Sequence, residues 1–127
     1  MINKDILSKH VHHHGHKISE EEMYDSYKIF FGTLVSGPRL KIINLLRKSE
    51  KNVSEIMNEL NMNQTSVSHN LIRLKDCGFV NIEVKGKFRY YSLNKETINP
   101  LMKIIDEHMA ENCVHILRTM KGGKELK

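Results

Sequence analysis

The spacing of apolar and polar residues is most informative between residues 53 and 78. A short helix is predicted by apolar residues at i, i+3, i+4 and i+7, namely Val53, Ile56, Met57 and Leu60. A polar break follows, and Asn63 at its end is of the type that caps a helix N-terminus. A second helix is predicted by Val67, Leu71 and Leu74, with Gly78 as its C-terminal stop. Two short helices joined by a tight turn are typical of a helix-turn-helix.

Residues 79–93 predict two β-strands joined by a turn. The runs 79–84 and 88–93 are rich in aromatic and β-branched residues, and Lys85-Gly86-Lys87 lies between them. A helix-turn-helix followed at once by a basic hairpin is a winged helix. The predicted fold class is therefore mainly α with a small β-hairpin.

The remaining segments predict flanking helices. Ser19 and Glu22 have the spacing of a capping box, and one face of the following helix is apolar, with Met23, Tyr27, Phe30, Phe31 and Leu34. Gly37-Pro38 starts another helix, whose buried side includes Leu40, Ile43 and Leu46. A single long helix is predicted from Asn94 to Lys121, because its apolar residues keep helical spacing for about six turns.

These elements suggest how the chain is organised. We expect a flexible histidine-rich tail over residues 1–18, a winged-helix domain over 19–121 and a short C-terminal tail over 122–127. The first and last helices would leave apolar stripes exposed in a monomer, so we expect them to form a two-fold dimer interface.

Several segments together resemble a known family. They are Pro38-Arg39-Leu40, the run Gln64-Thr65-Ser66-Val67-Ser68, Gly78-Phe79-Val80, and Gly86 before Tyr90-Tyr91. With them, residues 34–94 resemble the core of the ArsR/SmtB family of bacterial and archaeal repressors. The resemblance implies a homodimeric repressor that binds a pseudo-palindromic operator in double-stranded DNA, and it implies a metal-sensor type.

Composition narrows the class of protein. The chain has 127 residues, the size of one domain, and a formal net charge of +5, which is compatible with an anionic partner. Two cysteines without paired spacing suit a reducing cytosol, and neither a signal peptide nor a membrane-spanning run of about 20 apolar residues is evident. We expect a cytoplasmic protein without a membrane partner. It is not expected to be an enzyme, because the sequence has no glycine-rich phosphate loop, no paired carboxylates and no cysteine with an evident base.

The DNA-contacting residues are expected on the second helix of the motif and on the wing. The N-terminal half of that helix faces the major groove in such motifs, and Gln, Ser and Thr can bond base edges. Arg73 and the basic wing residues suit phosphates and the negative minor groove. For any one of these residues, a solvated helix face is the alternative. The candidates are Gln64, Thr65, Ser66, Ser68, His69, Arg73, Lys85, Lys87 and Arg89.

A metal site is expected on the last helix. His108, Glu111 and His115 lie within an arc of about 60° on the flank of its apolar stripe, and such donors suit zinc, or nickel or cobalt. The family's interhelical site has two ligand pairs, and the resemblance places His108 and Glu111 on the second pair. The first pair falls on Lys95 and Thr97, which cannot serve as ligands.

The histidine-rich tail could supply the missing ligands. Its candidates are His12, His14 and His16, although exposed histidines without a metal role, or an expression tag, would give the same pattern. The family's Cys-x-Cys thiolate site is absent, since that region reads Val53-Ser54-Glu55-Ile56, so an arsenic, cadmium or lead sensor is not expected.

The sequence therefore predicts a repressor that a divalent metal ion releases from its operator. Two alternatives remain open at this point. One is a winged-helix regulator without metal, responding to redox through Cys77 and Cys113 or to another effector. The other is a histidine-rich metal-buffering protein.

Overall fold

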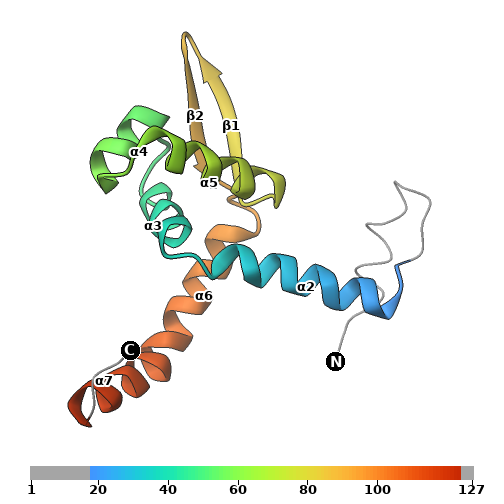
Figure 1. Ribbon diagram of the computed structural model, residues 1–127, viewed down its shortest axis with the longest axis vertical. Helices are drawn as coiled ribbons and strands as arrows, with labels where there is room; N and C mark the ends of the chain where they lie inside the picture. The colour runs from blue at the N-terminus through green and yellow to red at the C-terminus, as the bar shows by residue number, and fades with distance from the viewer. Residues whose placement is uncertain (1–17, 124–127) are drawn as a thin grey trace.

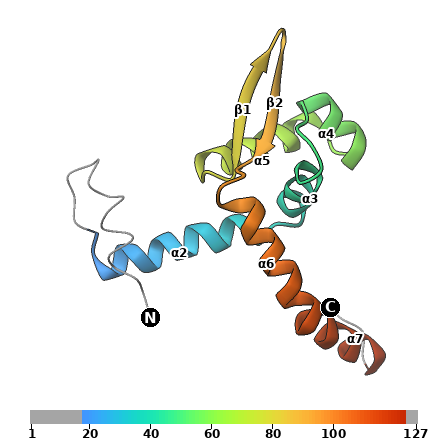
Figure 2. The same ribbon diagram turned by 180° about the vertical axis from the view of Figure 1, so that it is seen from behind.

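The computed structural model of the chain describes residues 18–123 (Figures 1 and 2). Over these residues it consists of α-helices and one antiparallel hairpin, which confirms the predicted fold class. The order is α2 (Glu20–Leu34), α3 (Gly37–Leu46), α4 (Val53–Leu60), α5 (Gln64–Asp76), β1 (Val80–Lys85), β2 (Phe88–Leu93), α6 (Ile98–Glu111) and α7 (Cys113–Gly123).

Local capping fixes where the first helices begin. The predicted capping box at α2 is present: the Glu22 amide donates to Ser19 Oγ at 3.1 Å, and the Ser19 amide donates to Glu22 Oε1 at 3.0 Å. Helix α3 is capped by Ser36 and carries Pro38 in its first turn, where a missing amide donor costs nothing.

The helix-turn-helix follows the predicted pattern closely. Helix α4 ends at Asn61, which adopts the left-handed conformation at φ 53°, and Asn63 caps α5 by accepting a hydrogen bond from the Ser66 amide at 2.8 Å. At the other end of α5 the chain turns at Gly78, where φ is +76°.

The wing is a two-stranded hairpin with a two-residue turn. Its register runs from Val80 opposite Leu93 to Lys85 opposite Phe88, and Gly86 in the turn has φ +63°. The bridge between Lys51 and Tyr91 fastens the base of the hairpin to the segment before α4.

One hydrophobic core holds these elements together. Its buried side chains come from α3, α4, α5, the hairpin and the start of α6: Ile42, Ile43, Leu45, Leu46, Ile56, Val67, Leu71, Leu74, Phe79, Val80, Leu93, Ile98 and Met102. Helix α2 joins this core through Phe30, whose ring stacks on Phe79 with centroids 5.2 Å apart.

The prediction of one continuous last helix is wrong. The helix divides at Asn112 into α6 and α7, and α7 turns away from the axis of α6 (Figure 1). The Asn112 side chain donates to the His108 carbonyl at 3.0 Å, and asparagine competes with the helix in this way. Helix α7 also continues through Gly123 rather than ending before Gly122.

The long helices project away from the winged part. In both views α2 and α6 leave the core in different directions, on the side opposite the tip of the hairpin (Figures 1 and 2). Among residues 18–123, no single helix is long and apolar enough to cross a membrane. Helices α2 and α3 have the length and composition of a membrane span only when they are taken together, and they are bent by 78° relative to each other. Helix α3 also buries Ile42 and Ile43 in the core.

Candidate nucleic-acid interface

Helix α5 buries one face and presents polar side chains on the other. Val67, Leu71 and Leu74 are buried at helical spacing. Of the predicted reading residues, the structure exposes Gln64, Thr65 and His69 and leaves Ser66 and Ser68 half-buried, all within the first two turns. An N-terminal helix end with several hydrogen-bonding side chains is suited to the edges of bases in a major groove.

Arg73 lies further along α5, two turns after Ser66 and one turn after His69, and therefore on their side of the helix. Its Nε donates to Thr33 Oγ1 of α2 at 3.0 Å, so the guanidinium joins two helices of the same protomer. The assignment of Arg73 to phosphate stays a prediction: its Nε has a partner on α2, while the residue as a whole is exposed.

The wing carries three cations in unequal surroundings. Lys85 forms ion pairs with Glu50 and, at 3.9 Å, with Glu83, and its Nζ lies 5.4 Å from the centre of the Tyr90 ring. The hydrogen bond to Glu50 raises the pKa of Lys85, and the nearby charge of Glu83 acts in the same direction. Over the described part of the chain, Lys87 and Arg89 have no ion pair. They are therefore the wing cations available to an external anion.

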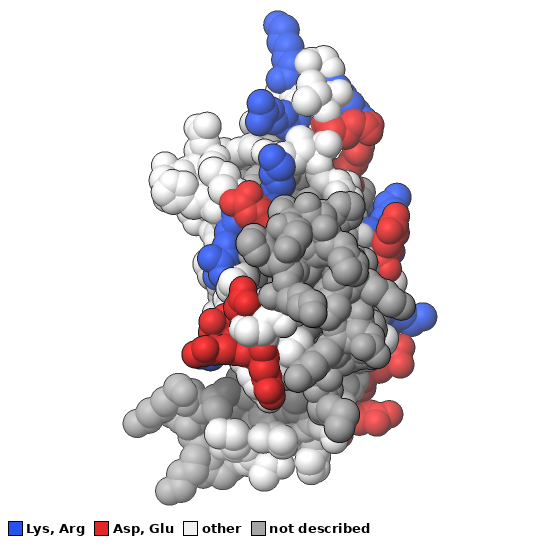
Figure 3. Space-filling model, turned by 90° about the vertical axis from the view of Figure 1, so that its right-hand side faces the viewer, with Lys and Arg blue, Asp and Glu red and all other residues white. Residues whose placement is uncertain are grey.

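Charge is unevenly distributed over the molecular surface. In the view of Figure 3, lysine and arginine side chains gather at the top, where the hairpin lies, and acidic side chains form a cluster in the lower half. Helix α2 begins with Glu20, Glu21 and Glu22, away from the wing. On this face the hairpin end therefore carries most of the basic side chains, with some acidic ones beside them, and a basic surface suits binding to a polyanion.

These features can be compared with known proteins. Residues 37–81, which hold α3, α4, α5 and the start of β1, match the profile of the family described as "Bacterial regulatory protein, arsR family". The transcriptional repressor SdpR of Bacillus subtilis is 33% identical over 78 residues, an alignment that covers 58% of this chain and 87% of SdpR. The chain belongs to the ArsR family.

Two further relatives are regulators with the same kind of DNA-binding domain or name. The HTH-type transcriptional regulator Rv0324 of Mycobacterium tuberculosis is 35% identical over 85 residues; this covers 64% of the present chain but only 38% of that longer protein. The solution structure of the homodimeric winged helix-turn-helix DNA-binding domain of Mb0332 from Mycobacterium bovis matches with a TM-score of 0.68. It is 29% identical, and the match covers 77% of this chain and 93% of that one. This ArsR-family chain is accordingly a DNA-binding transcriptional regulator and not an enzyme.

The predicted metal donors are separated by the break in the last helix. His108 and Glu111 are exposed on α6, three residues apart, whereas His115 is exposed on α7 beyond Asn112. Among residues 18–123 no three histidine, cysteine or acidic side chains come together as a metal site. The tail candidates His12, His14 and His16 lie outside the described residues.

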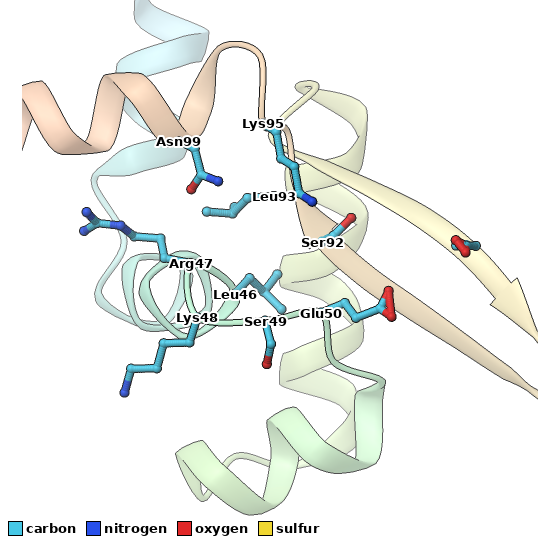
Figure 4. Close-up of a pocket in the computed structure, with 10 residues that line it drawn as sticks. Leu46, Arg47, Lys48, Ser49, Glu50, Ser92, Leu93, Lys95 and Asn99 are labelled. Carbon is cyan, nitrogen blue, oxygen red and sulfur yellow. The ribbon is translucent and has the colours of Figure 1, made fainter.

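Lys95, which the family resemblance places at a ligand position, lines a polar hollow instead. The hollow has a volume of about 480 Å³ and lies between the end of α3, the hairpin and the start of α6. Figure 4 shows Lys95 reaching past Leu93 toward Ser92, while Arg47 points outward. Arg47 forms an ion pair with Asp106 of α6 at 2.7 Å, which ties α6 to the winged part.

The two cysteines occupy different environments. Cys77 caps the C-terminal end of α5 and is half-buried, whereas Cys113 at the start of α7 is exposed. Neither cysteine is in a disulfide in the structure.

Sequence reasoning missed a group of polar residues beneath α5. Thr33, Arg39 and Asn70 form hydrogen bonds that connect α2, α3 and α5. The sequence held one indication of this group: Asn70 lies three residues after Val67 and four before Leu74, beside the buried stripe of the helix. A polar residue at such a position needs an internal partner.

Proposed function

We propose that this chain is a homodimeric repressor that binds a pseudo-palindromic operator and is released from it by a divalent metal ion. The observation that carries the DNA-binding part is the polar N-terminal half of α5, exposed on the same domain as the unpaired wing cations Lys87 and Arg89. In this proposal α5 reads bases in the major groove, and the wing holds the flanking backbone. Such a repressor would act in the cytoplasm, where bacterial and archaeal chromosomes lie.

The dimeric state is supported by apolar surface on two elements. Large apolar side chains are exposed along α2 and along α6 and α7: Tyr24, Tyr27, Phe31 and Val35 on the former, and Ile104, Met109, Ile116 and Met120 on the latter. Helix α2 also borders an apolar groove of about 350 Å³, lined in part by Phe30 and Phe31. A monomer rarely keeps this many large apolar side chains exposed along its helices. The related Mb0332 domain is homodimeric.

The metal part of the proposal is supported by the chemistry of the donors on α6. Metal sensors occur in the ArsR family. His108 and Glu111 lie one helical turn apart and are exposed, beside the apolar residues proposed for the dimer interface. Because they are only two donors, a complete site requires ligands from the second protomer, from His115 or from the tail. Imidazole and carboxylate donors suit zinc first, and nickel or cobalt second.

Repression and its release would follow from a shift between two dimer arrangements. In the metal-free state the two α5 helices fit successive major grooves, about 34 Å apart along the duplex. Metal bound between protomers would favour an arrangement in which this spacing no longer fits.

The test begins by selecting the preferred duplex from a random library with the full chain. We expect a palindromic consensus, binding by a dimer, and at least about a thousand-fold preference over a scrambled duplex at fixed salt. Zinc, nickel and cobalt are then titrated onto the preformed complex. Selection without a consensus would contradict the DNA-reading proposal, and a consensus with no response to any of the three metals would contradict only the effector.

A further inference from the structure

Thr33 is the single fully buried polar side chain within residues 18–120. Its hydroxyl donates to the Ile29 carbonyl at 2.7 Å within α2 and accepts from Arg73 Nε of α5 at 3.0 Å. Cys77 Sγ at the end of α5 lies 3.3 Å from the same oxygen. One side chain of α2 therefore contacts α5 at two positions.

Arg39 reinforces this junction from the first turn of α3. Its Nε donates to the Thr33 carbonyl at 2.8 Å, and a terminal guanidinium nitrogen lies 3.4 Å from the Gly32 carbonyl. Carbonyls in the last turn of a helix have no partner within the helix, and that turn favours a cation. Helix α2 has no basic residue in its own last turn, so Arg39 supplies the cation from the neighbouring helix.

The guanidinium also contacts the recognition helix. Its other terminal nitrogen lies 3.4 Å from Asn70 Oδ1, and Asn70 Nδ2 donates to the Ser66 carbonyl at 2.8 Å. Asn70 Nδ2 also lies 3.5 Å from Ser66 Oγ. An asparagine amide suits this place because it accepts from Arg39 on one side and donates toward Ser66 on the other. The hydrogen bonds thus run from the end of α2 to a residue at the reading end of α5.

We infer that Arg39 and Asn70 are positioning residues for sequence reading, and that they set the angle of α5 relative to α2. The inference rests on the proposed function, in which α5 reads bases and α2 contributes to the dimer interface. Apolar packing already holds α5 in the core, but such packing is not directional. The hydrogen bonds add direction, so that the position of α2 in a dimer determines how each α5 meets its half-site.

The test compares operator affinity with affinity for a scrambled duplex of equal length and salt, by fluorescence anisotropy with the full chain. Arg39→Gln and Asn70→Ala are each expected to weaken operator binding about ten-fold, the size of a modest loss of base discrimination. Binding to the scrambled duplex should stay within about two-fold, since neither residue is assigned to phosphate. The double variant should lose no more than the worse single variant, because both break one chain of contacts.

Two controls separate positioning from folding. Arg47→Gln removes the ion pair between Arg47, the residue that follows α3, and Asp106 of α6 without touching α5, and it should leave the ratio of the two affinities unchanged. In ¹⁵N spectra the signal of the terminal Arg39 nitrogen that donates to Asn70 should move in Asn70→Ala and move less in Asn70→Asp, which keeps the acceptor for Arg39 but loses the donor to Ser66.

Three results would overturn the inference. The first is an equal loss of affinity for the operator and for the scrambled duplex. The second is a loss of operator affinity in the double variant that equals the sum of the two single losses in free energy. The third is an unchanged ratio of the two affinities together with an unmoved Arg39 signal. If the wild-type chain itself fails to prefer its selected duplex, the proposed function fails and takes this inference with it. If the wild-type chain prefers its selected duplex and the variants keep this preference, only the positioning role of Arg39 and Asn70 is excluded.

Discussion

Side chains along α5 differ in what they contact, and we expect them to differ in their effect on DNA binding. Gln64 is the first residue of the helix, is exposed and can make two hydrogen bonds to adenine. Arg73, nine positions later, bonds to Thr33 inside the protein. The same helix therefore presents the proposed reading residues at one end and a contact with α2 at the other.

Gln64→Ala should relax sequence preference at one base position in each half-site. The expected cost is about 1–3 kcal/mol for the preferred base, with little change for other bases at that position. Affinity measured on a set of operators with single base changes gives this directly. A uniform loss across the set would mean that Gln64 does not face the bases.

Two lysines of the wing, Lys87 and Lys85, can be compared as a test variant and its control. Lys87 has no ion pair in residues 18–123, whereas Lys85 is paired with Glu50 and Glu83. Lys87→Ala should weaken binding to all duplexes and reduce the slope of log affinity against log salt by about one unit. Lys85→Ala should change that slope less, because its charge is already balanced within the protein. A larger effect for Lys85 would show that DNA displaces its carboxylate partners.

At the scale of elements, the break at Asn112 changes how a metal site can be built. A continuous helix would have carried His108, Glu111 and His115 on one rigid face. The observed division leaves a pair of donors on α6 and one donor on a separate helix.

His108→Ala should abolish metal-induced release while leaving metal-free operator affinity unchanged. Glu107→Ala is the control, because Glu107 is exposed on the same helix and was not assigned to the site. Deleting residues 1–16 should weaken metal affinity or change the preferred metal, with operator binding unaltered. Cobalt absorption spectra follow the coordination, and anisotropy follows DNA release. Release of the His108→Ala protein at wild-type metal concentrations would exclude this site.

At the scale of the whole molecule, the core accounts for only part of the apolar pattern. Ile98 and Met102 at the start of α6 are buried within the protomer, and Ile105 packs against them. Met109, Ile116 and Met120, further along, are exposed, and so is Ile104, which lies beside Ile105 and is 64% exposed. The part of the apolar stripe on α6 and α7 that remains exposed in the protomer is thus shorter than the sequence pattern suggested.

Ile104→Glu should shift the chain from dimer to monomer and abolish operator binding, since two half-sites could no longer be held together. Val84→Glu places the same charge on an exposed residue of the wing and should leave the dimer intact. Sedimentation at micromolar concentration distinguishes the two. A monomeric wild-type chain, or a dimeric Ile104→Glu chain, would contradict the proposed interface.

The sequence by itself determined the local features of this fold. Asn63, Gly78 and Gly86 act through their own backbone and nearest turns, so their roles at a helix cap, a helix end and a hairpin turn were predictable. The spacing of Val67, Leu71 and Leu74 likewise gave the buried face of α5, and with it the exposed face that we propose reads DNA. Each of these depends on residues close together in the chain.

Tertiary structure alone decided which distant polar groups meet. Thr33 and Arg73 are 40 positions apart, and Arg39 and Asn70 are 31 apart, so helical periodicity contains no information about their contact. The break at Asn112 was hidden for a related reason. Apolar spacing continues across it, while the asparagine that divides the helix interacts with the backbone and leaves the pattern of side chains unchanged.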